Sequence, residues 1–253
     1  MFDSLVRLTN LPPQDFAIAM AAVFLAGLVR GFAGFGLSAI LMASIVTIIP
    51  PIELIPICYV LEAAASFTMF RGGMKNADMR IVWGLVIWSA IGVPLGLFAT
   101  TSIDTDISRL IALAVILSLT IAQLLRVRPK FLASTMGLSV SGFAAGIVTG
   151  LASAGGMVVA LYVIALRTDV KTMRASLIMF LFIGMATSLV YLLLYDMMDQ
   201  QAFLRGLIFV PIVLLGVLLG TLLFRPSLAH LYKRVCLILL ISLCVAGLGQ
   251  QIY

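Results

Sequence analysis

The sequence GLVRGFAGFGLS at residues 27–38 interrupts an apolar run that extends over residues 15–49. It contains four glycines and Arg30, although glycine disfavours a helix by up to about 1 kcal/mol and arginine is costly within lipid. A helix that crosses a bilayer needs only about 20 residues. The run is therefore too long for one crossing, and we expect its helix to break at these glycines.

The composition of the chain is that of a membrane protein. Of the 253 residues, 63% are hydrophobic and only 10% are charged, and the mean hydropathy is +1.22. A soluble domain of this length has far more polar surface. Apolar segments lie at about residues 15–49, 52–70, 81–100, 107–125, 131–166, 175–195, 203–224 and 235–252. We expect an all-α, polytopic helical protein with about eight segments in the lipid bilayer, because the alternating pattern of spanning β-strands is not seen.

The first and fifth apolar segments resemble each other, and both are broken by small residues. FLAGLVRGFAGFGL at residues 24–37 aligns with FAAGIVTGLASAGG at residues 143–156, with seven of fourteen positions identical. Further along each half, GVPLG resembles GVLLG. Weak internal symmetry of this kind is typical of transporters. We predict two repeats within one membrane domain, residues 1–126 and 127–253.

Basic residues gather in four connections between the apolar segments. Twelve of the 16 lysines and arginines lie there: Arg71, Lys75, Arg80, Arg126, Arg128, Lys130, Arg167, Lys171, Arg174, Arg225, Lys233 and Arg234. Such residues favour the cytoplasmic side, so the net charge of +6 indicates membrane orientation and not a nucleic-acid partner. Segment 131–166 then begins and ends inside, and segment 15–49 begins and ends outside. The two repeats are therefore predicted to be inverted, with both termini outside.

Each predicted break frees backbone N–H groups at the start of a helix, inside the membrane. A helix N-terminus carries partial positive charge and binds anions readily, glycines let a ligand approach the backbone, and an arginine binds an oxyanion in a bidentate manner. We predict that a small anion binds at Arg30, Gly34, Gly36 and Ser38 of the first copy and at Ser153, Gly155 and Gly156 of the second.

Several of these residues have a second interpretation. The glycines would equally allow two helices to pack closely, and Arg30 would then reach the outer surface or pair with Glu62. Glu62 is the only carboxylate well inside a spanning segment, where it either carries a coupling proton or forms a structural ion pair. Arg174, at the start of a helix, either sets the topology or serves as a gate.

The paired glycine-rich breaks, the sequence DVKTMRAS at residues 169–176 and the overall length resemble the TauE/SafE family. This resemblance covers nearly the whole chain. It implies an exporter of a small sulfur oxyanion, such as sulfite or an organosulfonate, in the bacterial inner (plasma) membrane. It also implies a homodimer.

Two other functions stay open on the sequence. A passive anion channel has the same composition, although inverted repeats favour alternating access. An intramembrane serine hydrolase would use Ser153, but a serine nucleophile needs a nearby base, and the single histidine, His230, lies in a predicted cytoplasmic loop. We therefore expect no enzyme activity. We expect no cofactor either, and no metal site, because carboxylates and histidine are scarce.

Overall fold

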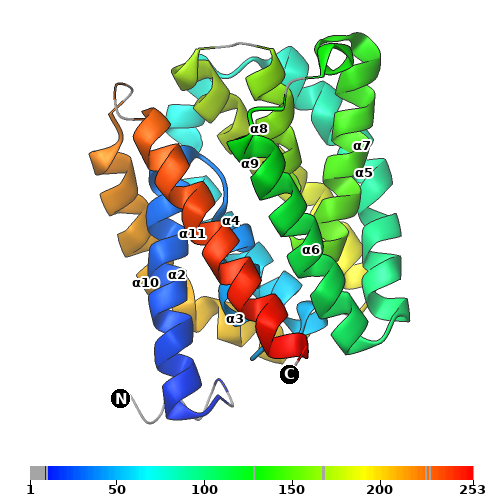
Figure 1. The fold of residues 1–253 in the computed structure, drawn as a ribbon, viewed down its shortest axis with the longest axis vertical. Coiled ribbons are helices and arrows are strands. Elements are labelled where there is room, and N and C mark those ends of the chain that lie inside the picture. The colour runs from blue at the N-terminus through cyan, green and yellow to red at the C-terminus, as the bar shows by residue number, and fades with distance from the viewer. Residues whose placement is uncertain are drawn as a thin grey trace.

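A computed structural model describes residues 9, 11–127, 129–166, 169–225, 227 and 229–252, without the side chains of 130, 229–233 and 252. Over this part of the chain every regular element is helical (Figure 1). The helices are α2 (Pro13–Ala33), α3 (Leu37–Ile45), α4 (Pro51–Asn76), α5 (Met79–Ser102), α6 (Thr105–Leu124), the short 3-10 helix η1 (Lys130–Ala133), α7 (Thr135–Ala152), α8 (Gly155–Ala165), α9 (Val170–Leu194), α10 (Gln200–Leu223) and α11 (Ala229–Ile252). Eight are long and apolar enough to cross a membrane, which confirms the predicted fold class.

The first and fifth apolar segments are both broken into a long helix followed by a short one. Between α2 and α3, Gly34 and Gly36 have φ values of 83° and 94°, a left-handed conformation that glycine adopts without the usual steric cost. Between α7 and α8, Ser153 takes a φ of 52°. The breaks therefore occur where the glycine and small-residue pattern predicted them.

Each broken segment begins and ends at the same end of the bundle. Arg205, near the start of α10, donates hydrogen bonds to the Thr9 carbonyl and to Glu53 at the start of α4. Arg109, near the start of α6, donates to the carbonyl of Val46, just after α3. The start of α2 and the end of α3 thus share one end, which we call the termini end because the first described helix, α2, begins there and the last, α11, ends there (Figure 1). The end of α8 contacts η1 at the opposite end.

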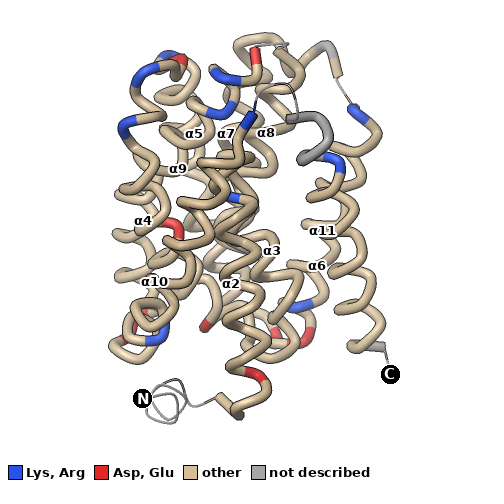
Figure 2. The backbone as a smooth tube through the Cα atoms, turned by 90° about the vertical axis from the view of Figure 1, so that its left-hand side faces the viewer, with Lys and Arg blue, Asp and Glu red and all other residues tan. Residues whose placement is uncertain are grey.

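The charge distribution separates these two ends. Figure 2 shows most lysines and arginines at the end opposite the termini, which we call the basic end, and most aspartates and glutamates toward the termini end. The basic end carries the connections α4–α5, α6–α7, α8–α9 and α10–α11. Arg128 and Arg167 lie outside the described residues, as do the side chains of Lys130, His230 and Lys233. That the basic end faces the cytoplasm stays a prediction.

Aspartates begin four of the helices that follow connections. Asp78, Asp104, Asp169 and Asp199 each accept a hydrogen bond from a backbone N–H in the first turn of α5, α6, α9 and α10. Such caps satisfy N–H groups that have no partner within the helix. Hydrogen bonds from Thr172 lower the pKa of Asp169, which lies in the α8–α9 connection.

The two halves are joined by two close helix crossings, in which α5 packs along α7 and α10 packs along α2. A Cβ atom placed on Gly96 of α5 would lie 2.2 Å from the Ile147 carbonyl oxygen of α7. A Cβ placed on Gly220 of α10 would lie 2.1 Å from the Leu28 carbonyl oxygen of α2. Leu28 and Ile147 occupy the same position in the alignment of the two copies. These matching contacts support the predicted repeats, whose boundaries and inverted arrangement stay predictions.

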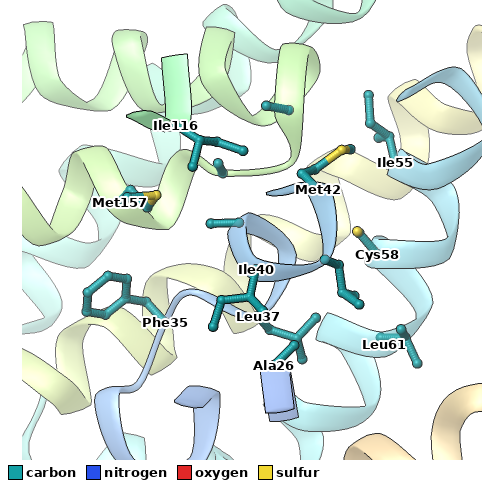
Figure 3. Packing of buried hydrophobic residues seen from close by; sticks show 14 of the residues in the cluster. Ala26, Phe35, Leu37, Ile40, Met42, Ile55, Cys58, Leu61, Ile116 and Met157 are labelled. Atoms are coloured by element: carbon teal, nitrogen blue, oxygen red, sulfur yellow. The ribbon is translucent and has the colours of Figure 1, made fainter. Parts of the chain in front are cut away.

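The short helices lie at the centre of the molecule. Eight of the nine residues of α3 are buried, and Leu37, Ile40 and Met42 contribute to the core around the breaks (Figure 3). Met157 at the start of α8 is 1% exposed and belongs to the same cluster. Backbone groups freed by the breaks are therefore covered by protein, as required within a bilayer.

Candidate functional site

The tips of the two broken segments meet inside the bundle and enclose a small cavity. Its lining includes Gly36, Ser38, Ser153 and Gly156, which are four of the seven predicted anion-site residues, together with Glu62. Neither α3 nor α8 has a side-chain cap at its N-terminus. The cavity of about 10 Å³ is close to the space that one water molecule needs. We call it the tip cavity.

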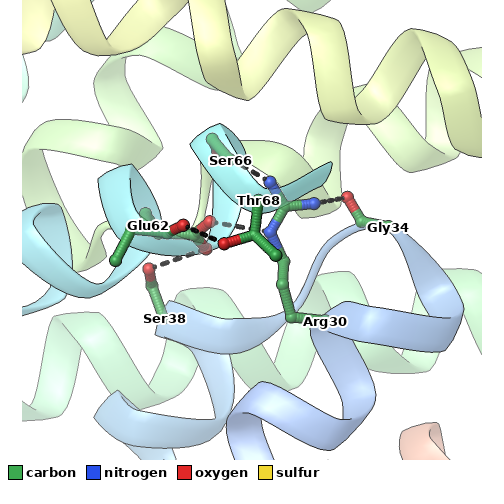
Figure 4. Close-up of polar contacts among 7 residues, drawn as sticks. Arg30, Gly34, Ser38, Glu62, Ser66 and Thr68 are labelled. Atoms are coloured by element: carbon green, nitrogen blue, oxygen red, sulfur yellow. Dashed lines mark hydrogen bonds and ion pairs between the residues drawn. The ribbon is translucent and has the colours of Figure 1, made fainter. Parts of the chain in front are cut away.

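Arg30 is completely buried beside the tip cavity, and its guanidinium is bonded to protein groups (Figure 4). Its Nε lies 2.9 Å from Oε2 of Glu62, and its Nη2 lies 3.0 Å from Oγ of Ser66. Its Nη1 donates to the carbonyl of Gly34, at the end of its own helix. Of the partners considered from the sequence, the structure therefore gives Arg30 the ion pair with Glu62.

Glu62 lies between the buried Arg30 and the tip cavity. Its second carboxylate oxygen, Oε1, accepts a hydrogen bond of 3.1 Å from the Ser38 hydroxyl of α3. The side chain is 14% exposed, whereas that of Arg30 is 0% exposed. Removing one partner from such a pair costs about 3–5 kcal/mol because it leaves a charge buried without compensation. Glu62 is thus the member of the pair that a ligand or a proton reaches first.

A larger cavity of about 60 Å³ extends from Glu62 toward the termini end, and we call it the outer cavity. It lies between α4, α5, α7 and α9 and shares Glu62, Ser153 and Leu181 with the tip cavity. Most of its lining is apolar, with hydroxyl groups from Tyr59, Ser89, Thr149, Ser153 and Ser188. A polar solute that enters from the termini end would therefore meet hydroxyl donors and then the Glu62–Arg30 pair.

A third cavity of about 50 Å³, the inner cavity, lies on the basic side of the breaks. It is lined by Gly36, Arg174, Phe224 and Cys236, among apolar side chains. It shares Gly36 with the tip cavity and no lining residue with the outer cavity. The tips of the two broken segments therefore separate the outer cavity from the inner cavity, and these two cavities extend in opposite directions.

Arg174 joins the start of α9 to the end of α2. Its Nε donates to the Phe32 carbonyl at 3.1 Å, its Nη2 donates to the Gly31 carbonyl, and its guanidinium lies 4.5 Å from the centroid of the Phe224 ring. The last carbonyls of a helix have no partner within it, so cations at this end are stabilising. Arg174 thus closes one side of the inner cavity by linking helices from the two halves of the chain.

The packing interpretation holds for some of the glycines. A Cβ placed on Gly155 would lie 2.1 Å from Oγ1 of Thr149 and 2.4 Å from the carbonyl oxygen of Ala145, in the preceding helix. Gly34 ends α2 and contacts Arg174, so it too is needed for close approach. Thr149 aligns with Arg30, and its hydroxyl donates to the Ala145 carbonyl of its own helix. The charged group at the tips therefore comes from the first copy alone.

Several polar residues of the site were not predicted from the sequence. Ser66 holds Arg30, and Tyr59, Ser89 and Ser188 line the outer cavity. Tyr59 and Ser66 lie three residues before and four residues after Glu62, so helical spacing would have placed them on the Glu62 face. Ser89 and Ser188 are brought there by the packing of α5 and α9, for which the sequence has no local signal.

Comparison with known proteins places this arrangement in a family. The family model described as "Sulfite exporter TauE/SafE" matches residues 19–247, which include both breaks and all the residues that line the cavities described above. No curated protein and no solved structure matches the chain.

Proposed function

The chain belongs to the TauE/SafE family of sulfite exporters, and from this membership we propose that it exports a small sulfur oxyanion by alternating access. The substrate would be sulfite or an organosulfonate, and the membrane would be the bacterial inner membrane. The observation that supports this best is the pair of cavities on opposite sides of the hairpin tips. A carrier needs one binding site that is reached from either side of the membrane in turn, and the tips lie between the outer and the inner cavity.

We propose that the anion binds at the tips between the two halves, where Arg30 and the uncapped N-termini of α3 and α8 converge. Gly36, Ser38, Ser153 and Gly156 line this place directly. Gly34 and Gly155 contribute by holding the backbone of each break in position. Backbone N–H groups and a guanidinium together match an oxyanion better than either does alone. The predicted homodimer stays a prediction.

The alternative function, a passive channel, is tested by the kinetics of flux. In proteoliposomes, uptake of radiolabelled sulfite should saturate with external concentration, and unlabelled sulfite inside should accelerate it. A carrier behaves this way because each cycle requires its single site to reorient. Protein-free liposomes are the control. Flux that rises linearly with concentration and ignores internal sulfite would show a channel and contradict the carrier proposal.

We propose Arg174 as the gate on the basic side, and we propose that this side faces the cytoplasm. Cys236 is buried and lines the inner cavity together with Arg174. Arg174→Ala should open that cavity and raise the rate of Cys236 modification by an impermeant maleimide. Because hydrogen bonds to charged groups contribute about 1.5–3 kcal/mol each, the increase should be on the order of tenfold or more.

This labelling experiment uses inside-out and right-side-out vesicles. Lys171→Ala is the matched control, because Lys171 is an exposed basic residue one turn earlier that does not line the cavity. Cys58 and Cys244 are 0% exposed and should stay unlabelled. An unchanged rate in Arg174→Ala would exclude the gate, and labelling from right-side-out vesicles alone would reverse the proposed orientation.

A further inference from the structure

We infer that Glu62 occupies the anion's place on Arg30, and that substrate binding displaces this carboxylate and is accompanied by uptake of one proton by Glu62. The inference rests on the proposed function and adds how binding and proton movement are linked at the same site. It starts from the contacts of Arg30, whose Nε, Nη1 and Nη2 are already bonded to Glu62, Gly34 and Ser66.

The tip cavity is too small for the anion unless the Glu62 carboxylate moves away. The tip cavity, at about 10 Å³, is close to the volume of a single water molecule. A sulfonate group, with three oxygens around sulfur, does not fit there while the Glu62 carboxylate stays on Arg30 and Ser38. The outer cavity, at about 60 Å³, borders Glu62 and gives its side chain room to swing away. The same movement would expose Arg30 and the Ser38 hydroxyl to the incoming anion.

The balance of charge at the tips favours the uptake of a proton together with the anion. Arg30 and Glu62 neutralise each other, so an added anion would be balanced only by the partial positive charges at the N-termini of α3 and α8. Arg174 does not supply the missing charge, because it is held on the Gly31 and Phe32 carbonyls, at the negative end of the α2 dipole. Protonation of the displaced Glu62 restores neutrality. Glu62 lines both the tip cavity and the outer cavity, so the anion and the proton would meet at this residue.

No other described group around Glu62 is suited to take that proton. The polar and titratable groups near Glu62 are Arg30 from α2, Ser38 from α3, Cys58, Tyr59 and Ser66 from α4 itself, Ser89 from α5, Thr149 and Ser153 from α7, and Ser188 from α9. Glu62 is the only carboxylate among them. The linkage is therefore assigned to this one residue.

The test is calorimetric titration of methanesulfonate into the purified wild-type protein. Methanesulfonate is the anion of a strong acid, so its own charge is constant between about pH 6 and about pH 8. Titration in two buffers with different heats of ionisation counts the protons bound with each anion. We expect about one, and we expect affinity to fall by up to about tenfold for each unit of rising pH while Glu62 is charged.

Glu62→Gln should bind methanesulfonate without proton uptake, with an affinity that no longer depends on pH. Glu53→Gln is the matched control: Glu53 also lies on α4 and pairs with an arginine, Arg205, but away from the tips, so it should retain the wild-type response. If Glu62→Gln does not fold, the two-buffer titration of the wild type decides the question alone. Binding without proton uptake would overturn this inference and leave the proposed function intact. Failure of methanesulfonate, sulfite and thiosulfate all to bind would overturn both.

Discussion

Replacing Arg30 with alanine should strongly weaken anion binding and also destabilise the folded protein. Each charge-assisted hydrogen bond lost to the anion is worth about 1.5–3 kcal/mol, so affinity should fall by about ten- to a hundredfold or more. The variant also leaves Glu62 buried without its partner, at a cost of about 3–5 kcal/mol. Calorimetry with methanesulfonate measures the first effect, and thermal unfolding in detergent measures the second.

A double variant separates these two effects. Arg30→Ala combined with Glu62→Gln removes both charges, so much of the stability should return while anion binding stays weak. Arg30→Lys keeps the charge without the planar fork and should bind weakly. Wild-type affinity in the folded double variant would show that Arg30 is not a ligand. The glycine-rich break would then serve only to pack helices.

Gly96→Ala should be among the most destabilising single-methyl substitutions in this chain. The new Cβ would lie 2.2 Å from the Ile147 carbonyl oxygen and 2.9 Å from the Gly150 Cα, both backbone atoms of α7. Backbone cannot rotate away as a side chain does, so α5 and α7 must separate along their crossing. We expect a loss of about 3 kcal/mol, the upper end of typical overpacking costs, seen as a fall of about 10 °C in the midpoint of thermal unfolding.

Two further variants complete the comparison. Gly220→Ala should have an equal effect, because its Cβ would meet the Leu28 carbonyl oxygen of α2 in the corresponding crossing. Gly72→Ala is the control, since Gly72 lies in α4 with nothing within 4 Å of the added atom, and alanine favours a helix over glycine. Equal unfolding midpoints for Gly96→Ala and Gly72→Ala would contradict the close crossing.

The helices and breaks were predictable from the sequence because they follow from local chemistry. Apolar length gives a membrane helix, and glycines at 34 and 36 permit the left-handed backbone that ends α2. The register between Phe24 and Phe143 gives equivalent positions to Leu28 and Ile147, whose carbonyls lie in the two crossings. Each of these features depends on the residues of one segment or on the likeness between two.

The candidate site was only partly predictable because its contacts join distant segments. Arg30 and Glu62 are 32 positions apart, and the sequence offered that pair only as one of several partners. Arg174 reaches carbonyls more than 140 positions away. Backbone carbonyls leave no signature in a sequence, so nothing indicated that Arg174 caps α2. The positions of Ser89 and Ser188 depend on helix packing for the same reason.

The contact between Arg174 and α2 has a consequence for the balance between the two halves of a transport cycle. In the register that aligns the hairpins, the first-copy residue that corresponds to Arg174 is Ile55, which lines the outer cavity. On the side of the inner cavity, Arg174 makes hydrogen bonds to α2 and lies over the Phe224 ring. On the side of the outer cavity, Ile55 at the equivalent position has a side chain that makes only apolar contacts. If the two copies exchanged their roles, the resulting state of the carrier would therefore have a different free energy. Even with equal substrate on both sides, the carrier would spend unequal times facing each compartment, so half-saturation of transport would need different substrate concentrations on the two sides although net flux would still be zero.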